Sequence, residues 1–252
     1  MAVKSRKNKT RMAVNQITEE IIPRTLNQLL SRLSFLFTMP VKTRDEVKHF
    51  AQVRLDMLSG IGVVSDGLDI DMPLNSNDED EALKFLRKNN VQTDAFAGLH
   101  SFGSKPYKWW PFDRMAKVGD YLYKKYNLKP IIFGGVKEKE KAIEMSGMME
   151  MKPLIAAGEL SIRGSAALIK KCRLFITTDS GPMHIAQAVK TPTIALLWST
   201  STQTGPVNKD SIIFYGNCSN KDKNPTACTE TIQIEDVMKA VEKLFLNKSF
   251  CS

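Results

Sequence analysis

From Ala95 onward, short apolar runs alternate regularly with stretches of helical, amphipathic period. The apolar runs have the length and residue types of buried strands, which we expect at 95–102, 130–133, 153–156, 173–177, 193–198 and 211–215. The stretches between and after them predict helices at 112–126, 137–145, 162–171, 182–189 and 234–246. Such alternation is typical of βαβ units, so we expect an α/β fold with a Rossmann-like, mainly parallel sheet and flanking helices.

The first 94 residues lack this alternation and predict a short, mostly helical region. Leucines from Leu26 to Leu33, followed by Phe37, have the spacing of an amphipathic helix that Pro40 would end. A second helical pattern covers about 44–59. We interpret the polar run 75–81 as a surface connection into a short helix at 81–88. Two parts are therefore expected, a helical region with a linker at 1–94 and a Rossmann-like domain at 95–252.

Composition indicates a globular protein, since 42% of the 252 residues are hydrophobic. No run approaches the ~18 apolar residues of a membrane span, and the N-terminus lacks a signal peptide pattern, so we expect a cytoplasmic protein. The four cysteines form no CxxC pair and have no histidine at zinc-ligand spacing. We therefore expect free thiols, with neither a bound metal nor a cofactor.

The net charge of +9 is concentrated at the N-terminus, where five of the positive charges lie at Lys4, Arg6, Lys7, Lys9 and Arg11. The rest of the chain carries +4. We interpret the basic stretch as a solvated end, and contact with anionic lipid or nucleic acid is the alternative. No specific nucleic acid partner is expected, because the loops described next have no aromatic ladder on which single strands stack.

Ligands of such sheets bind beyond the carboxyl ends of the strands, and the loop Thr177–His184 lies at one of those ends. Asp179 or Ser180 suits the cap of the helix that follows. Gly181 would let a diphosphate approach the backbone N–H groups of the helix start, where the dipole favours negative charge. His184, in the first turn, could donate to the same phosphates. The residues alone leave an ordinary capped helix as an equal alternative.

Two further loops carry candidate chemistry. In 101–111, Ser104 offers a hydroxyl, and Lys105 and Lys108 offer positive charge to an anionic ligand. The alternative there is a solvated basic turn. In 134–138, glycines would let a base or ribose lie against the backbone, and Glu138 could accept from ribose hydroxyls, whereas a plain tight turn is the alternative. The Ser/Thr-rich segment 198–206 could close over the site.

Three motifs in these loops together resemble the donor-binding half of glycosyltransferase family 9, the heptosyltransferases, which have the two-domain GT-B architecture. A family pattern of Lys-x-Trp-Pro fits 108–111, Gly-Gly-x-x-Glu fits 134–138, and Asp-[Ser/Thr]-Gly-Pro-x-His fits 179–184. The similarity runs from about His49 to the last predicted helix.

The resemblance implies roles for these residues. In the family, the lysine and the Asp-Ser/Thr-Gly loop hold the donor diphosphate, and the glutamate lies near the ribose. The expected donor contacts are thus Ser104, Lys108, Glu138, Asp179, Ser180, Gly181 and His184. The implied reaction is an inverting transfer from ADP-heptose to a lipopolysaccharide core acceptor without a catalytic metal, with peripheral contact to the inner membrane.

The N-terminal region departs from the family pattern. A full member begins with another Rossmann-like domain, of a usual domain size of about 150 residues, that binds the acceptor and supplies the general base. Fewer than 95 residues precede the donor half here, so no catalytic base can be named. The sequence leaves open an enzyme that needs a separate acceptor domain or a longer parent chain, and a binding-only remnant. A nucleic-acid-binding protein, the third alternative, rests on charge alone.

Overall fold

The computed structural model describes residues 49–59, 62–65, 67–91, 95–198, 205–206, 209–217 and 227–246. The chain divides into two compact units, Met1–Leu68 and Asp69–Ser252. In the first unit, helix α3 (Phe50–Ser59) lies within the predicted helical pattern 44–59. The predicted helix at 26–37 and the basic stretch lie outside the described residues.

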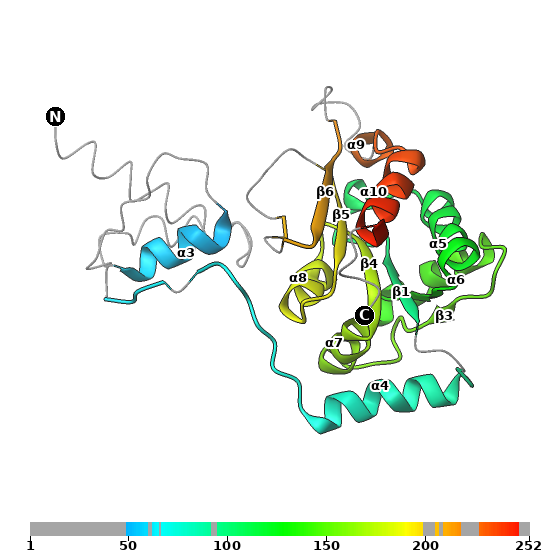
Figure 1. Ribbon diagram of the computed structural model, residues 1–252, viewed down its shortest axis with the longest axis horizontal. Coiled ribbons are helices and arrows are strands. Elements are labelled where there is room, and N and C mark those ends of the chain that lie inside the picture. Colours follow the sequence, from blue (N-terminus) through cyan, green and yellow to red (C-terminus); the bar gives the residue numbers. More distant parts are fainter. Residues whose placement is uncertain are drawn as a thin grey trace. The chain divides into compact units, whose positions relative to one another are not determined.

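The second unit is built on a six-stranded sheet in which every neighbouring pair of strands is parallel, in the order β3-β2-β1-β4-β5-β6 (Figure 1). Its strands are β1 (Phe96–His100), β2 (Lys129–Ile132), β3 (Leu154–Ile155), β4 (Cys172–Thr178), β5 (Thr193–Leu197) and β6 (Ser211–Tyr215). All six predicted strands are present, and the prediction of a Rossmann-like parallel sheet is confirmed.

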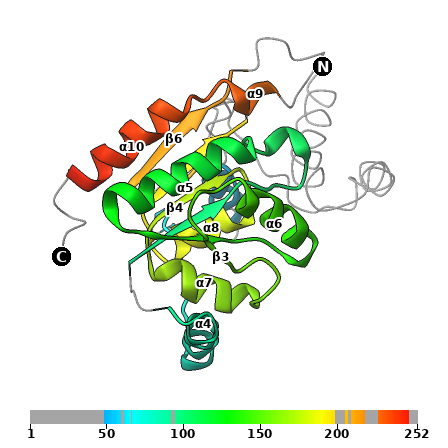
Figure 2. The same ribbon diagram turned by 90° about the vertical axis from the view of Figure 1, so that its right-hand side faces the viewer.

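Helices cover both faces of this sheet, as Figure 2 shows with α5 and α10 on one side and α7 on the other. The helices of the second unit are α4 (Ser76–Lys88), α5 (Phe112–Tyr126), α6 (Lys139–Gly147), α7 (Ile162–Lys170), α8 (Gly181–Ala188), α9 (Ala227–Glu230) and α10 (Ile234–Leu246), with short 3-10 turns η2 (Pro106–Lys108) and η3 (Val136–Glu138). Each helix that the periodicity predicted after Ala95 is present within two residues of its expected ends.

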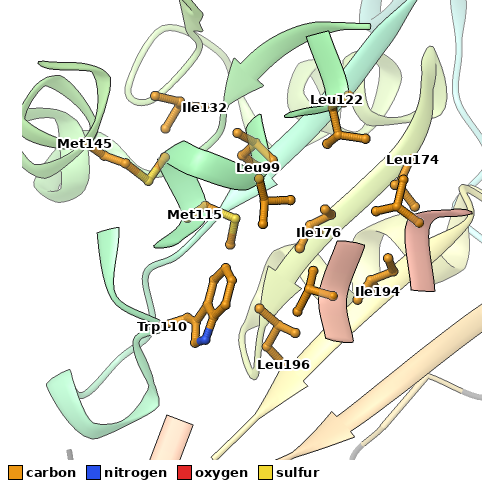
Figure 3. Packing of buried hydrophobic residues seen from close by; sticks show 14 of the residues in the cluster. Leu99, Trp110, Met115, Leu122, Ile132, Met145, Leu174, Ile176, Ile194 and Leu196 are labelled. Carbon is orange, nitrogen blue, oxygen red and sulfur yellow. The ribbon is translucent and has the colours of Figure 1, made fainter. Parts of the chain in front are cut away.

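Alternate residues of the strands build two separate cores. In β1, Ala97 and Leu99 pack with α5, α6 and α10, whereas Phe96 packs with α4, α7 and α8. This follows from the two-residue period of a strand, which sends successive side chains to opposite faces. Figure 3 shows the first core, where Trp110 lies beside Met115 and the β5 residue Leu196. Trp110 is fully buried, so it anchors the loop that follows β1.

The polar run 75–81 is not a surface connection, and this prediction was wrong. Helix α4 begins at Ser76, where Asn75 and Asp78 form a reciprocal capping box: each side chain accepts from the other's backbone N–H. The capping box satisfies two N–H groups of the first turn, which lets acidic residues start the helix. The run is polar because its residues cap the helix and form its exposed first turns.

Helix α4 belongs to the second unit, which begins at Asp69. Arg163 of α7 forms an ion pair with Asp78. Its Nε donates to Oδ1 at 3.0 Å, and its Nη2 donates to Oδ2 at 2.7 Å. Ala82 and Phe85 of α4 are buried in the second core. The ion pair and this apolar face attach α4 to the domain that carries the sheet.

Cys172 is a buried free thiol, but Cys228 is disulfide-bonded, so the expectation of four free thiols was wrong. Spacing along the chain does not reveal which cysteines a fold brings within bonding distance. None of the described helices is both long and apolar enough to cross a bilayer.

Candidate functional site

The three motifs meet at the carboxyl edge of the sheet. They occupy the segments that follow β1, β2 and β4, and these strands are direct neighbours in the order β2-β1-β4. In a parallel sheet, loops that follow adjacent strands lie side by side. The strand order therefore brings together residues from 100 to 180.

An ion pair between Lys108 and Asp179 joins two of these loops. Lys108 ends η2, Asp179 follows β4, and Nζ lies 2.8 Å from Oδ2. The two side chains are only 22% and 13% exposed. The indole Nε1 of Trp198 also donates to Oδ2, at 3.2 Å. One carboxylate oxygen thus holds the lysine ammonium in front of α8.

Close backbone approach around Gly103 makes this pair possible. A Cβ at Gly103 would lie 3.1 Å from the Cβ of Lys108, which is tighter than ordinary contact. Trp109 donates from Nε1 to the Gly103 carbonyl at 2.9 Å. The hydroxyl of Thr178 donates to the Phe102 carbonyl at 2.7 Å, so the loop is fastened to the end of β4. These bonds fix the direction in which the lysine side chain leaves the loop.

The start of α8 is open. Ser180 is its N-cap residue in extended conformation, but its hydroxyl makes no capping bond and instead donates to the Thr178 carbonyl at 3.0 Å. A Cβ built at Gly181 meets no atom within 4 Å. Backbone N–H groups in the first turn of a helix carry partial positive charge. An anion can therefore approach the backbone at Gly181 without steric conflict.

His100 contacts the N-cap residue of this helix and was not among the predicted site residues. It ends β1 and is 1% exposed, with Nδ1 3.2 Å from the hydroxyl of Ser180 and Nε2 4.0 Å from Oε2 of Glu138. Burial lowers the pKa of His100 to about 3, so the ring is neutral near pH 7. The predicted strand 95–102 contained His100, so nothing in the pattern marked it as a residue at the strand end.

The 3-10 turn η3 orients the side chain of Glu138 at the carboxyl edge of the sheet. It is the last residue of η3, and its Oε2 accepts from the backbone N–H of Gly135 at 2.7 Å. That bond requires Gly134 to pass close by, since a Cβ there would lie 3.1 Å from Oε2. The glycine pair and the glutamate thus form one small structural unit beside His100.

The structure brings some predicted residues together and leaves others at the rim. Lys108 and Asp179 are in contact, and His100 lies between Ser180 and Glu138. Ser104 is exposed in the bend before η2, and His184 is exposed in the first two turns of α8. Segment 199–204 lies outside the described residues. At its start, the Trp198 ring packs edge-to-face on Tyr107 with centroids 4.9 Å apart.

Comparisons with known proteins point to one family. The sequence model described as glycosyltransferase family 9 (heptosyltransferase) matches residues 43–233. Lipopolysaccharide heptosyltransferase 3 of Escherichia coli (strain K12) is 30% identical over 210 residues, which are 78% of this chain and 59% of that protein. The chain therefore spans little more than half the length of this relative.

Solved structures show the same fold. The glycosyl transferase family 9 structure from Veillonella parvula DSM 2008 superposes with a TM-score of 0.74 at 26% identity, covering 86% of this chain and 66% of that chain. E. coli ADP-heptose lps heptosyltransferase II has a TM-score of 0.62 at 20% identity, covering 73% and 56%. Because the family's sequence model matches most of the residues, this chain belongs to glycosyltransferase family 9, the heptosyltransferase family.

Proposed function

We propose that this chain binds a nucleotide diphosphate sugar, ADP-heptose, as the donor for inverting transfer to a lipopolysaccharide core acceptor. One observation carries the proposal: the Lys108 ammonium is held by Asp179 in front of the open N-terminus of α8. A lysine charge beside a helix start is a suitable site for a diphosphate. The names of the family and of the relatives support the heptose and the lipopolysaccharide acceptor.

The reaction gives each residue a defined task. An acceptor hydroxyl attacks the anomeric carbon from the side opposite the diphosphate, its oxygen forms the new C–O bond, and the old bond to the phosphate oxygen breaks. Negative charge then develops on the leaving diphosphate, where Lys108 and the N–H groups at Ser180 and Gly181 would stabilise it. In this proposal, His184 and Ser104 add donors at the rim, and Glu138 accepts from ribose hydroxyls.

The proton of the acceptor hydroxyl has no free carboxylate to accept it among the described residues of the three motif loops. Of the carboxylates described in the three motif loops, Asp179 is engaged by Lys108 and Trp198, and Glu138 by the N–H of Gly135. This engagement favours a second candidate function for the unit, which is donor binding without turnover until an acceptor-binding domain is supplied. Contact with the inner membrane would accompany the lipid-linked acceptor.

Calorimetric titration of the purified chain tests donor binding. We expect ADP to bind, and UDP to bind more weakly. The affinity for ADP should not change in excess EDTA, because Lys108 supplies the positive charge. A ligand at 100 times its Kd should also stabilise the fold by about 2.7 kcal/mol. Absence of both heat and thermal shift with ADP and ADP-heptose contradicts the proposal. Product formation from ADP-heptose and a lipid A-linked acceptor, with and without a separately expressed acceptor domain, distinguishes turnover from binding alone.

A further inference from the structure

A cavity of about 720 Å³ lies beside the edge strand β3, apart from the candidate donor site. Residues from the end of α4, the end of α5 and the starts of β2 and β3 line it. None of Lys108, Glu138 and Asp179 is among them. The volume is within the range of small-molecule sites, which is about 300 to 1,000 Å³.

The lining of the cavity has an excess of positive charge. Lys88, Lys129 and Lys152 line it together with one carboxylate, Glu159. That carboxylate is already engaged, because Lys88 contacts its Oε2 at 3.0 Å and Lys139 its Oε1 at 2.7 Å. These two lysines hold the pKa of Glu159 at about 2. Glu159 therefore remains charged and paired at ordinary pH.

Lys129 and Lys152 have no carboxylate partner of this kind among the described residues. The ammonium of Lys129 donates to the backbone carbonyl of Lys152 at 2.8 Å, and no carboxylate of the described residues forms an ion pair with either lysine. Burial, and then the charge of Lys152, lowers the pKa of Lys129. Lys129 is partly buried and Lys152 is exposed, and an anion bound between them would offset the charge of both.

Other lining residues of the cavity are apolar. Phe85 and Leu154 are only 5% and 8% exposed yet reach the cavity, and the ring of Tyr123 borders it while 38% exposed. A pocket with an apolar wall and a few convergent charges is the common form of a small-molecule site. The lysines and the apolar side chains suit different parts of one ligand.

We propose that this cavity is a second binding site, for a small organic anion in which a carboxylate, phosphate or sulfonate group is carried on an aromatic or aliphatic body. The acid group pairs with Lys129 and Lys152, and the body packs on Phe85, Tyr123 and Leu154. The site stands independently of the nucleotide site, and the proposal does not rest on the donor function.

Fluorescence titration of the full chain with 8-anilinonaphthalene-1-sulfonate tests the site, with the uncharged N-phenyl-1-naphthylamine as the matched probe. The sulfonate should bind about tenfold more tightly than the uncharged dye, which corresponds to about 1.4 kcal/mol. In the double variant Lys129→Met/Lys152→Met this difference should vanish. Phenyl phosphate and benzoate should displace the sulfonate dye, whereas benzyl alcohol should not.

Two control variants separate this site from other surfaces. Lys117→Met removes an exposed lysine of α5 that is outside the cavity lining, and Lys108→Met alters the candidate donor site; both should keep the wild-type dye affinities. Thermal unfolding confirms that each variant is folded. Equal binding of the two dyes, or unchanged sulfonate affinity in a folded double variant, overturns the proposal.

Discussion

Lys108 and Asp179 are 71 positions apart in the sequence, and their side chains meet with Nζ 2.8 Å from Oδ2. The contact exists because β1 and β4 are adjacent at the centre of a sheet with the order β3-β2-β1-β4-β5-β6. Connections leave these two strands in opposite directions across the sheet. Such a switch point opens a crevice beyond the carboxyl ends of the strands, where ligands of open α/β sheets bind.

Replacement of Lys108 by methionine should weaken ADP binding by about 10- to 100-fold. Loss of a charge-assisted hydrogen bond to a phosphate costs about 1.5 to 3 kcal/mol. Calorimetric titration measures the change. Lys105→Met is the matched control in the same loop, because Lys105 is exposed and is not the partner of Asp179. Equal losses in the two variants would show that only the general charge of the loop matters.

Gly181→Ala should separate binding from folding. A Cβ at Gly181 has no atom within 4 Å, and alanine is a better helix former than glycine by up to about 1 kcal/mol, so the free energy of unfolding should not fall. In the proposed complex the donor diphosphate lies against the backbone at Gly181, so the added methyl group would crowd it and ADP affinity should drop about tenfold. Gly147→Ala, equally open but in α6, is the control and should leave ADP binding unchanged.

Glu138→Gln should affect the nucleoside part of the donor alone. We expect about tenfold weaker ADP binding, since a charged acceptor for ribose hydroxyls is lost, and unchanged binding of inorganic pyrophosphate. Lys108→Met should weaken both ligands. Glu140→Gln, which alters an exposed residue of α6, controls for surface charge. Weaker pyrophosphate binding in Glu138→Gln would instead mean that this carboxylate acts at the diphosphate and not at the ribose.

Local pattern predicted the strands and helices after Ala95 because the parallel strands are buried on both faces and read as apolar runs. It failed at α4, where Asn75 and Asp78 were taken as loop residues although an Asn followed three residues later by an acid is a capping signal. Polarity alone does not distinguish a capped helix start from a surface connection.

The sequence also predicted Lys108 and Asp179 as donor contacts, but it did not predict that they form an ion pair. That contact depends on strand order, which the alternation of strands and helices does not determine. His100 was missed for a related reason: its neighbours, Ser180 and Glu138, come from other loops. The cavity beside β3 was likewise invisible, because its two uncompensated lysines become neighbours only in the fold.

The neutral state of His100 should make folding sensitive to mild acid. Its pKa is about 6.5 in the unfolded chain and about 3 in the folded protein. Below pH 6.5 the unfolded chain therefore binds a proton that the folded protein rejects. The contribution is fully present above pH 6.5 and is lost as the pH falls toward 3. Between pH 7 and 5 the loss from this group should be about 2 kcal/mol.

Urea unfolding of wild-type protein and His100→Gln at pH 7, 6 and 5 measures this loss. Glutamine keeps a polar group between Ser180 and Glu138 but cannot take up the proton, so its free energy of unfolding should change less with pH by about 2 kcal/mol. Thr177→Val is the matched control, because it removes a hydroxyl 3.4 Å from Nδ1 and no titratable group, and it should keep the wild-type pH dependence. Parallel curves for wild type and His100→Gln would mean that the folded protein accepts the proton. The ring would then be charged beside Glu138 in the folded protein.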